Sequence, residues 1–182
     1  MAWSTPMTAV AGTGLTAAQW NASVRDNLLE TAPSKATGSF TTGAWFVTNG
    51  ANAIAEREIN QAEVTTSESD NMTSFADISA GTVGPSLTMT TGTNSLIFLQ
   101  AQQSNSTANA AVFSSLAISG ATTSAAIDNR AMITNAAASQ PQRAGVSNLM
   151  SLTAGSNTFS MQYRVASNTG TWSRRRMSAM AL

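Results

Sequence analysis

Cysteine and histidine are both absent from this sequence of 182 residues. Without them the chain can have no disulfide, no thiolate or imidazole metal site, and no nucleophile activated by histidine. It also lacks the side chain that ordinarily changes charge near neutral pH. A metal would have to be held by oxygen ligands alone, and the carboxylates lack the spacing of a calcium-binding loop. We therefore expect no metal and no cofactor.

Charged side chains are scarce, with 9 of each sign and a net charge of zero. None lies in the fifty residues between Asp77 and Asp128. A protein that binds nucleic acid needs a basic face to collect phosphates, so we expect no nucleic-acid partner. The one basic cluster, Arg174 to Arg176, is short for a phosphate tract. We expect its arginines to pair with carboxylates or to line a subunit contact.

Long apolar runs are absent as well. The most hydrophobic stretch is only Leu96 to Leu99, so the sequence predicts no membrane span. The N-terminal residues do not show the basic region followed by an apolar region that is typical of a signal peptide. We therefore expect a chain that is made and folded in a cytosol and has no membrane partner.

Small and uncharged polar residues fill the chain instead. There are 32 alanines, 25 threonines and 24 serines, whereas Leu, Ile, Val and Phe together number 31. A single chain of this size offers limited interior for so weakly apolar a sequence, and burial between subunits would supply the rest. The uncharged stretch also favours strands that face other subunits, although Ser, Thr, Asn and Gln alone could keep them soluble. We expect a homotrimer.

Residues 1–33 are predicted to form an N-terminal arm and a helix. Thr16 to Gln19 fits a capping box, in which the Thr16 hydroxyl accepts a hydrogen bond from the Gln19 N–H. The helix would continue to Glu30 and end before Pro33. A helix of about 14 residues is marginal alone in water, so it must dock on something.

We interpret the arm and helix as an anchor inserted into a neighbouring protein, with Trp3 and Trp20 as binding hot spots. The alternative is that these two tryptophans pack on the rest of their own chain. An apolar stripe along the helix is compatible with docking of either kind. The candidate attachment residues are Trp3, Pro6, Leu15, Trp20, Val24, Arg25 and Leu28.

Residues 34–69 are predicted to be a linker with short strands. Strand-like runs at 44–47 and 53–55 flank the turn signal Asn49-Gly50. Acidic residues cluster towards the end of this segment, but their spacing lacks the pattern of a calcium loop, which favours a solvated surface.

Residues 70–182 are predicted to be a jelly-roll-like β-sandwich, so the chain as a whole is expected to be mainly β. Phe159, Met161, Tyr163 and Val165 alternate with polar residues, as on a strand with one buried face. Turn residues separate short strand-like runs along the whole segment. The predicted strands are 73–78, 86–91, 95–103, 110–119, 131–135, 144–153, 157–166 and 171–182.

The two ends of the sequence carry a resemblance. Trp3-x-Thr5-Pro6, then Gly14 to Asn21 and Val24 to Glu30, resemble the opening of small virion structural proteins of tailed bacteriophages, especially those of actinobacterial hosts. Leu152 to Phe159, followed by Tyr163-Arg164-Val165, resembles their trimeric β domain.

The resemblance implies a virion component whose partners are further copies of itself and the major capsid protein or a tail protein. One function it implies is a head-decoration or head-fibre protein, and the alternative is a minor tail or tail-fibre protein that touches the host surface and its glycans. No coiled-coil heptads or shaft repeats are present to project a receptor-binding tip, which favours the head.

Two rival functions of other classes can be weighed from the sequence. A glycosidase needs two carboxylates across a cleft, and Asp77 and Asp128 are isolated candidates that nothing in the sequence brings together. We therefore expect no enzymatic activity. A carbohydrate-binding module needs an exposed aromatic platform, for which Trp45 and Trp172 are candidates, but we expect both to pack in a core or an interface.

Overall fold

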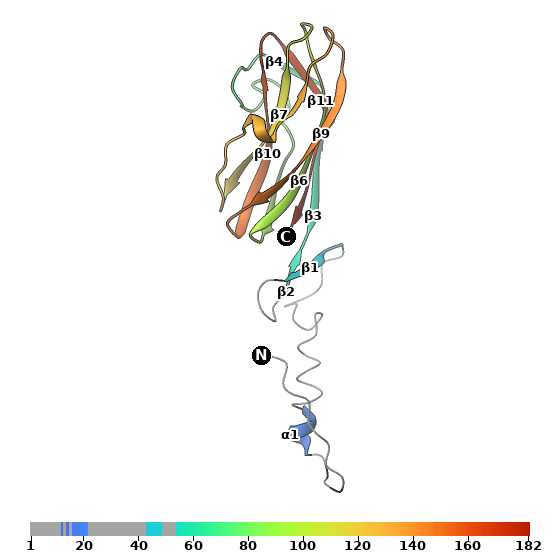
Figure 1. The fold of residues 1–182 in the computed structure, drawn as a ribbon, viewed down its shortest axis with the longest axis vertical. Helices are drawn as coiled ribbons and strands as arrows, with labels where there is room; N and C mark the ends of the chain where they lie inside the picture. The colour runs from blue at the N-terminus through green and yellow to red at the C-terminus, as the bar shows by residue number, and fades with distance from the viewer. Residues whose placement is uncertain (1–11, 13, 15, 22–42, 49–53) are drawn as a thin grey trace. The chain divides into compact units, whose positions relative to one another are not determined.

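The computed structural model describes residues 12, 14, 16–21, 43–48 and 54–182. The chain divides into two compact units, Met1–Arg57 and Glu58–Leu182 (Figure 1). Within the described residues, no helix has both the length and the apolar character needed to cross a bilayer.

The described part of the first unit contains a helical turn and a hairpin. The turn is α1 (Ala17–Trp20), where the Thr16 hydroxyl accepts a hydrogen bond from the Gln19 N–H at 3.2 Å. The Gln19 side chain accepts one in return from the Thr16 N–H at 3.0 Å, so the predicted capping box is confirmed. The hairpin pairs β1 (Trp45–Thr48) with β2 (Ile54–Arg57), close to the two strand-like runs. The predicted continuation of the helix to Glu30 lies outside the described residues.

The second unit is a jelly roll of two antiparallel sheets packed face to face (Figure 1). One sheet has the order β5-β10-β7-β8, and the other has the order β3-β11-β6-β9, with β4 pairing to β11 on the same side as β3. Apart from the β7-β8 pair, each step along the chain from β5 to β11 crosses to the other sheet, so the chain wraps around a single core. The predicted mainly β, jelly-roll-like sandwich is confirmed. The strands are β3 (Ile59–Val64), β4 (Glu68–Asp70), β5 (Ser86–Thr91), β6 (Asn94–Asn105), β7 (Val112–Gly120), β8 (Met132–Thr134), β9 (Gln142–Ser151), β10 (Gly155–Val165) and β11 (Gly170–Ala181), with a short 3-10 helix, η2 (Asp128–Arg130), before β8.

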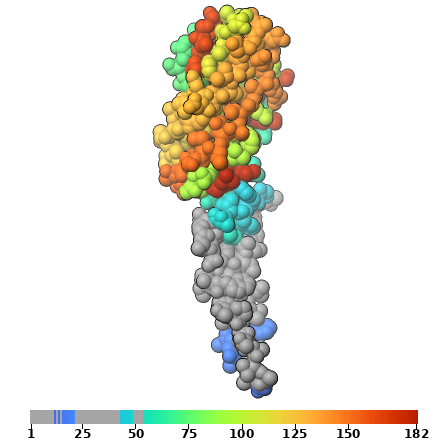
Figure 2. Space-filling model, in the orientation of Figure 1, coloured from blue at the N-terminus to red at the C-terminus, as the bar shows by residue number. Residues whose placement is uncertain are grey.

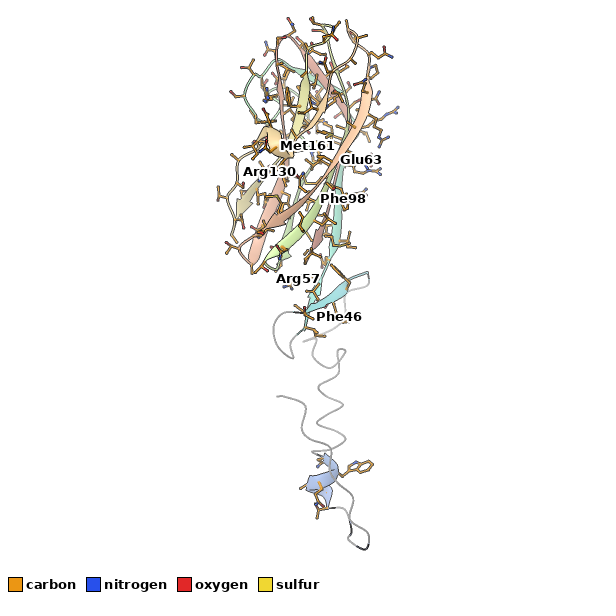
Figure 3. The ribbon with its side chains drawn as sticks, in the orientation of Figure 1. Phe46, Arg57, Glu63, Phe98, Arg130 and Met161 are labelled. Carbon is orange, nitrogen blue, oxygen red and sulfur yellow. The ribbon has the colours of Figure 1, made fainter. Side chains whose placement is uncertain are left out.

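Alternate residues of the long strands fill this core. On β10, Phe159, Met161, Tyr163 and Val165 are fully buried, and the residues between them are partly covered, as the alternation predicts. Met161 lies inside the sandwich in Figure 3. Each large apolar side chain buried in this way stabilises the fold by about 1.5 to 3 kcal/mol. In the space-filling view, atoms from the middle and the end of the chain interleave over the visible face of this unit (Figure 2).

A β-bulge in β11 directs an arginine into the core. Ser173 and Arg176 pair with Gln102 and Gln100 of β6, so β11 holds one extra residue at this point. Arg174 has a φ of 48°, in the left-handed region, and is exposed. The side chain of Arg175 is consequently turned inward and is fully buried.

The structure differs from the strand predictions in two segments. The predicted strand at 73–78 is wrong, because only Ala76 forms a bridge, to Tyr163. The Asp70 carboxylate accepts hydrogen bonds from the N–H groups on both sides of this segment, at Asn71 and Ser79, which replaces ladder pairing with a local fold. In addition, β3 and the first two residues of β4 lie within 34–69, the predicted linker with short strands, and belong to the second compact unit, which begins at Glu58.

Candidate interaction surface

The outer face of the β3-β11-β6-β9 sheet carries a continuous apolar row. Strand register places Ile59 opposite Met180, Met180 opposite Leu96, and Leu96 opposite Leu149. These four residues, which we name the apolar band, therefore run across all four strands on one face. Ile59 is 54% exposed and Leu149 is 68% exposed. A row of this kind is distinct from the scattered single apolar residues that any surface carries.

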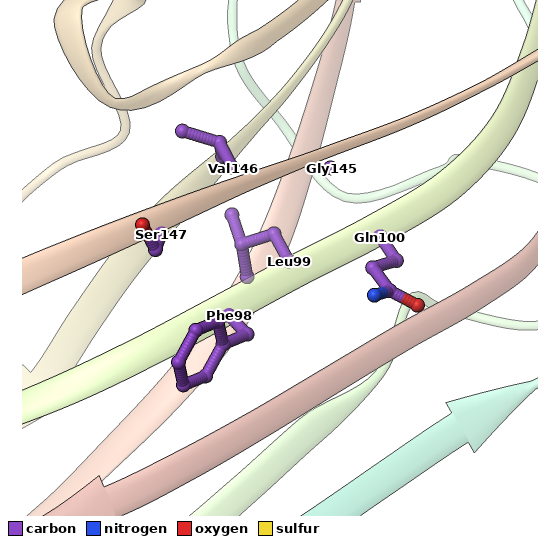
Figure 4. Close-up of a pocket in the computed structure, with 6 residues that line it drawn as sticks. All are labelled: Phe98, Leu99, Gln100, Gly145, Val146 and Ser147. Carbon is purple, nitrogen blue, oxygen red and sulfur yellow. The ribbon is translucent and has the colours of Figure 1, made fainter.

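Phe98, labelled in Figures 3 and 4, lies in the next row and lines two hollows. Its ring is 41% exposed. Figure 4 shows Phe98 and Gln100 projecting to one side of β6, while Leu99 and Val146 point to the other side. The hollow towards β9 measures about 210 Å³ and the one towards β3 measures about 180 Å³. They are lined by Phe98, Leu99, Gln100, Gly145, Val146 and Ser147, and by Gln61, Phe98, Gln100, Arg176 and Ser178, respectively.

Gly145 forms part of the floor of the first hollow because it has no side chain. It pairs with Gln100 across the β6-β9 ladder. A Cβ atom added at Gly145 would lie 3.2 Å from the Leu99 carbonyl oxygen and 3.3 Å from Gln100 Cγ. Any larger residue would fill the hollow beside Phe98 and press on its neighbours.

The charges on this face largely neutralise each other. Arg176 Nη2 lies 2.9 Å from Glu63 Oε2 in an ion pair across β11 and β3. This ion pair lies one row beyond the row that contains Phe98. The Phe98 row and the apolar band contain no charged residue. Arg143 lies farther along the sheet, opposite Gln102. The expectation that the C-terminal arginines pair with carboxylates is confirmed for Arg176.

The outer face of the other sheet has a different character. Where β5 pairs with β10, the outward positions are hydroxyl residues, and Thr88 Oγ1 lies 2.7 Å from Thr158 Oγ1. Beside them, the Ser115 hydroxyl on β7 donates a hydrogen bond to the Ile127 carbonyl oxygen at 2.7 Å. The segment that contains Ile127 therefore packs against this part of the sheet. No apolar row comparable to the apolar band is present here among the described residues.

An ion pair with aromatic contacts fixes the same side of the second unit. The Arg164 guanidinium carbon lies 3.6 Å from the centre of the Phe113 ring and 5.2 Å from that of Phe75. The same guanidinium donates two hydrogen bonds of 2.7 Å to the two oxygens of Asp128. Asp128, one of the two isolated carboxylates considered for catalysis, is thus committed to an ion pair. Asp77, the other, is not brought into any metal-binding cluster of the described residues.

Several polar groups surround the buried side chain of Arg175. Its Nη2 donates a hydrogen bond to the Thr82 carbonyl oxygen at 3.1 Å, and the Thr82 N–H donates to Glu68 Oε1 at 3.1 Å. This N–H hydrogen bond holds the pKa of Glu68 below its usual value, and the positive charge of Arg175 acts in the same direction. Tyr163 packs beside the guanidinium and against the Trp172 ring, and both aromatic side chains are fully buried. Burial raises the pKa of the Tyr163 hydroxyl.

The structure excludes one of the two tryptophans that were candidates for stacking on a sugar. Trp172 is fully buried in the core, so it cannot present a stacking face to a glycan, and the expected core role is confirmed. Trp45, on β1, is half-buried. A surface for a host glycan is therefore not formed by Trp172.

Of the seven candidate attachment residues, Trp20 is the one in the described part of the chain, at the end of α1, and it is 55% exposed. The other six, Trp3, Pro6, Leu15, Val24, Arg25 and Leu28, lie outside the described residues. Sequence reasoning missed the apolar band. Its four members are far apart in the chain, and only strand register brings them into one row.

Comparisons with known proteins show similarity of fold at most. No family model and no curated protein matches the chain. Among solved structures, infectious bursal disease virus of strain Gx shares 7% identity over 74% of this chain and 36% of that chain, with a TM-score of 0.47. The VP2 subviral particle of the same virus shares 10% identity over 74% of this chain and 37% of that chain, with a TM-score of 0.48. Eiger TNF from S. frugiperda shares 12% identity over 68% and 92% of the two chains, with a TM-score of 0.44.

This chain spans little more than a third of the length of the two viral proteins. At such identities and TM-scores the likenesses carry no functional argument. The jelly-roll assignment rests on the strand order of the chain itself.

Proposed function

We propose that this chain is a structural protein of a bacteriophage virion, a homotrimer that decorates the head and is held there by residues 1–33. Its partners would be further copies of itself and the major capsid protein. The resemblance of the N-terminal strings to small virion proteins of tailed bacteriophages supports this proposal. The structural observation that carries it is the apolar band, because an exposed apolar row bordered by polar residues has the composition of a protein contact surface.

The chemistry of the described residues also favours an assembly role over catalysis. They contain no group of three or more acidic residues placed to hold a metal ion. Asp128 is neutralised by Arg164, so it is a poor candidate for a general acid or a nucleophile. We accordingly propose that the protein is not an enzyme.

Attachment through the N-terminal arm gives Trp20 a specific role. The side chain is 55% exposed in the free chain, so it contributes little to the stability of the protein by itself. A tryptophan that becomes buried in a partner is a common binding hot spot, worth about 2 to 4 kcal/mol. We propose that Trp20 and Trp3 insert into the head surface.

Co-sedimentation with head particles that lack this protein tests the proposal. The full chain should sediment with the particles, and Trp20→Ala should weaken attachment by about 2 to 4 kcal/mol without changing the melting temperature of the free protein. Phe46→Ala is the matched control, because Phe46 is an aromatic residue of the same unit that is 41% exposed. It should attach as the wild type does. Unchanged attachment of Trp20→Ala, with or without a lower melting temperature, would contradict the anchor.

A further inference from the structure

We infer that the apolar band and Phe98 form the surface through which copies of this chain contact one another, so that the occupant of the outer face of the β3-β11-β6-β9 sheet is a second copy. The inference deepens the proposed function and rests on it for the biological role of the contact. The choice between the two outer faces follows from the apolar row. One face carries it across all four strands from Ile59 to Leu149, whereas the other has exposed Ile127 and Ile133 but no such row, and carries hydroxyl groups such as the Thr88 and Thr158 pair.

The distribution of charge favours a second copy over a charged partner. Copies that meet around a three-fold axis bring the side chains that lie at the axis near their own equivalents, so a charged residue there would repel itself. The apolar band and the Phe98 row contain no charged residue. The charges in the row beyond Phe98, Glu63 and Arg176, are paired within one chain at 2.9 Å and need no counter-charge from outside, and Glu58 lies beyond the end of the band, directly before Ile59. A partner recognised by its charge would find nothing complementary in these two rows.

The shape of the outer face of the β3-β11-β6-β9 sheet also suits contact between protein surfaces. Phe98 projects beside the two hollows that it lines, of about 210 and 180 Å³, so each copy offers both an aromatic projection and places to receive side chains. Interfaces between proteins are enriched in such aromatic anchors seated in pockets. Gly145 keeps the first hollow open.

The place where the chain enters the sandwich gives a further argument. Ile59, one end of the apolar band, is the first residue of β3 and follows the first unit almost directly in sequence. Contacts made through the band of each copy would therefore gather the points from which the first units leave the sandwich. Several anchors starting close together would bind a head surface with the avidity of linked sites.

Substitution of Leu149 tests the inference. Leu149 is 68% exposed within one chain, so Leu149→Glu should leave the far-UV circular dichroism and melting of a single copy unchanged. Sedimentation equilibrium of the full chain at micromolar concentration should give three times the chain mass of 18.8 kDa for the wild type. Leu149→Glu should weaken association by about 30-fold or more, as expected for a charge placed in a hot spot. Ile59→Glu should do the same and serves if the first variant fails to fold.

Thr90→Glu is the matched control, because it places the same charge at an exposed strand position on the other sheet. It should associate as the wild type does. An intact trimer in both Leu149→Glu and Ile59→Glu would overturn the inference, as would equal dissociation by Thr90→Glu.

A monomeric wild type would also overturn the inference, and hydroxyl-radical labelling of Met180 would then show why. If Met180 is labelled in the monomer, the apolar band is uncovered. If Met180 is protected from labelling in the monomer, the first unit of the same chain covers the band. None of these results depends on virions. A monomer found in virions would refute the inference and the proposed homotrimer but not the virion role, and a trimer absent from virions would refute the virion role but not the inference.

Discussion

Arg175 and Tyr163 lie against each other inside the sandwich, with the guanidinium carbon 5.6 Å from the centre of the tyrosine ring. Neither side chain has exposed surface. The bulge at Arg174 allows both Trp172 and Arg175 to face the interior, because strict alternation from Trp172 would turn Arg175 to the outside of the sheet. Burying the charge of Arg175 costs desolvation free energy, so an apolar side chain of similar volume at this position provides a test of what the charge contributes.

Two substitutions at Arg175 separate packing from charge. Arg175→Ala should lower the free energy of unfolding by about 3 to 5 kcal/mol, because it opens a cavity and leaves the Thr82 carbonyl oxygen without its donor. Arg175→Met should cost much less, because it fills most of the volume and removes a buried charge. Chemical denaturation followed by tryptophan fluorescence measures both. Equal losses in the two variants would show that the charge itself stabilises the fold.

Tyr163 is the single tyrosine of the sequence, so its ionisation can be observed directly. Burial raises its pKa, so the folded state favours the neutral form. Stability should therefore be unaffected below the pKa of about 10 of a free phenol and should fall as the pH rises above it. An ultraviolet titration should show tyrosinate only as the protein unfolds. Reversible tyrosinate formation near pH 10 in the folded protein would contradict the buried position.

The loss of folding stability at acid pH should depend on Asp70. Burial opposes ionisation of this carboxyl, but hydrogen bonds from the hydroxyl and N–H of Ser79 outweigh it and hold the pKa of Asp70 below its usual value. A lowered carboxyl pKa stabilises the fold at higher pH, and this contribution is lost as the pH falls below about 4. Melting measured from acid to neutral pH should show this loss, and Asp70→Asn should reduce it. A slope in Asp70→Asn equal to that of the wild type would contradict the assignment.

Neutral pH and redox conditions should not affect the assembly. With no histidine and no cysteine, no side chain of ordinary pKa titrates between about pH 6 and 8, and no disulfide can be reduced. Sedimentation of the full chain should give the same mass across this range, with or without dithiothreitol. A transition near pH 6.5 or a change of mass in the reductant would contradict the reasoning.

The pairing of Arg164 with Asp128 can be measured by a double-mutant cycle. Arg164→Gln should lower the free energy of unfolding by about 1 to 3 kcal/mol, since it removes both the ion pair and the cation–π contact with Phe113. The coupling with Asp128→Asn should be only about 0.5 to 1 kcal/mol, because Asp128 is 55% exposed. Arg174→Gln, at an exposed arginine, is the control and should change little. A coupling near zero would mean that the aromatic contact alone holds Arg164.

Sequence patterns were sufficient for the strands that bury one face. The alternation from Phe159 to Val165 predicted the interior and exterior of β10, and turn residues located β5 at 86–91. β3 was not predicted as part of the sandwich, because two of its three inward residues, Asn60 and Ala62, are small or polar and its exposed residues include a carboxylate. Such a strand owes its place to pairing with β11 and not to its own pattern.

The candidate surface and the buried arginine were beyond the reach of sequence patterns for a different reason. The apolar band depends on the register between strands up to 121 residues apart, from Ile59 to Met180, and no local pattern contains that information. The inward position of Arg175 depends on a bulge that reverses the alternation of β11. A run of three arginines in sequence gives no indication that one of them is exposed, one is buried and one is paired.

The copy number of this protein in purified virions, determined by quantitative mass spectrometry against the major capsid protein, is the most direct test of the proposed head-decoration role. The account predicts many copies per particle, in a fixed ratio to the major capsid protein and in a multiple of three. A handful of copies would contradict head decoration and would favour the minor tail or tail-fibre alternative. Complete absence from purified virions would contradict the proposed function itself.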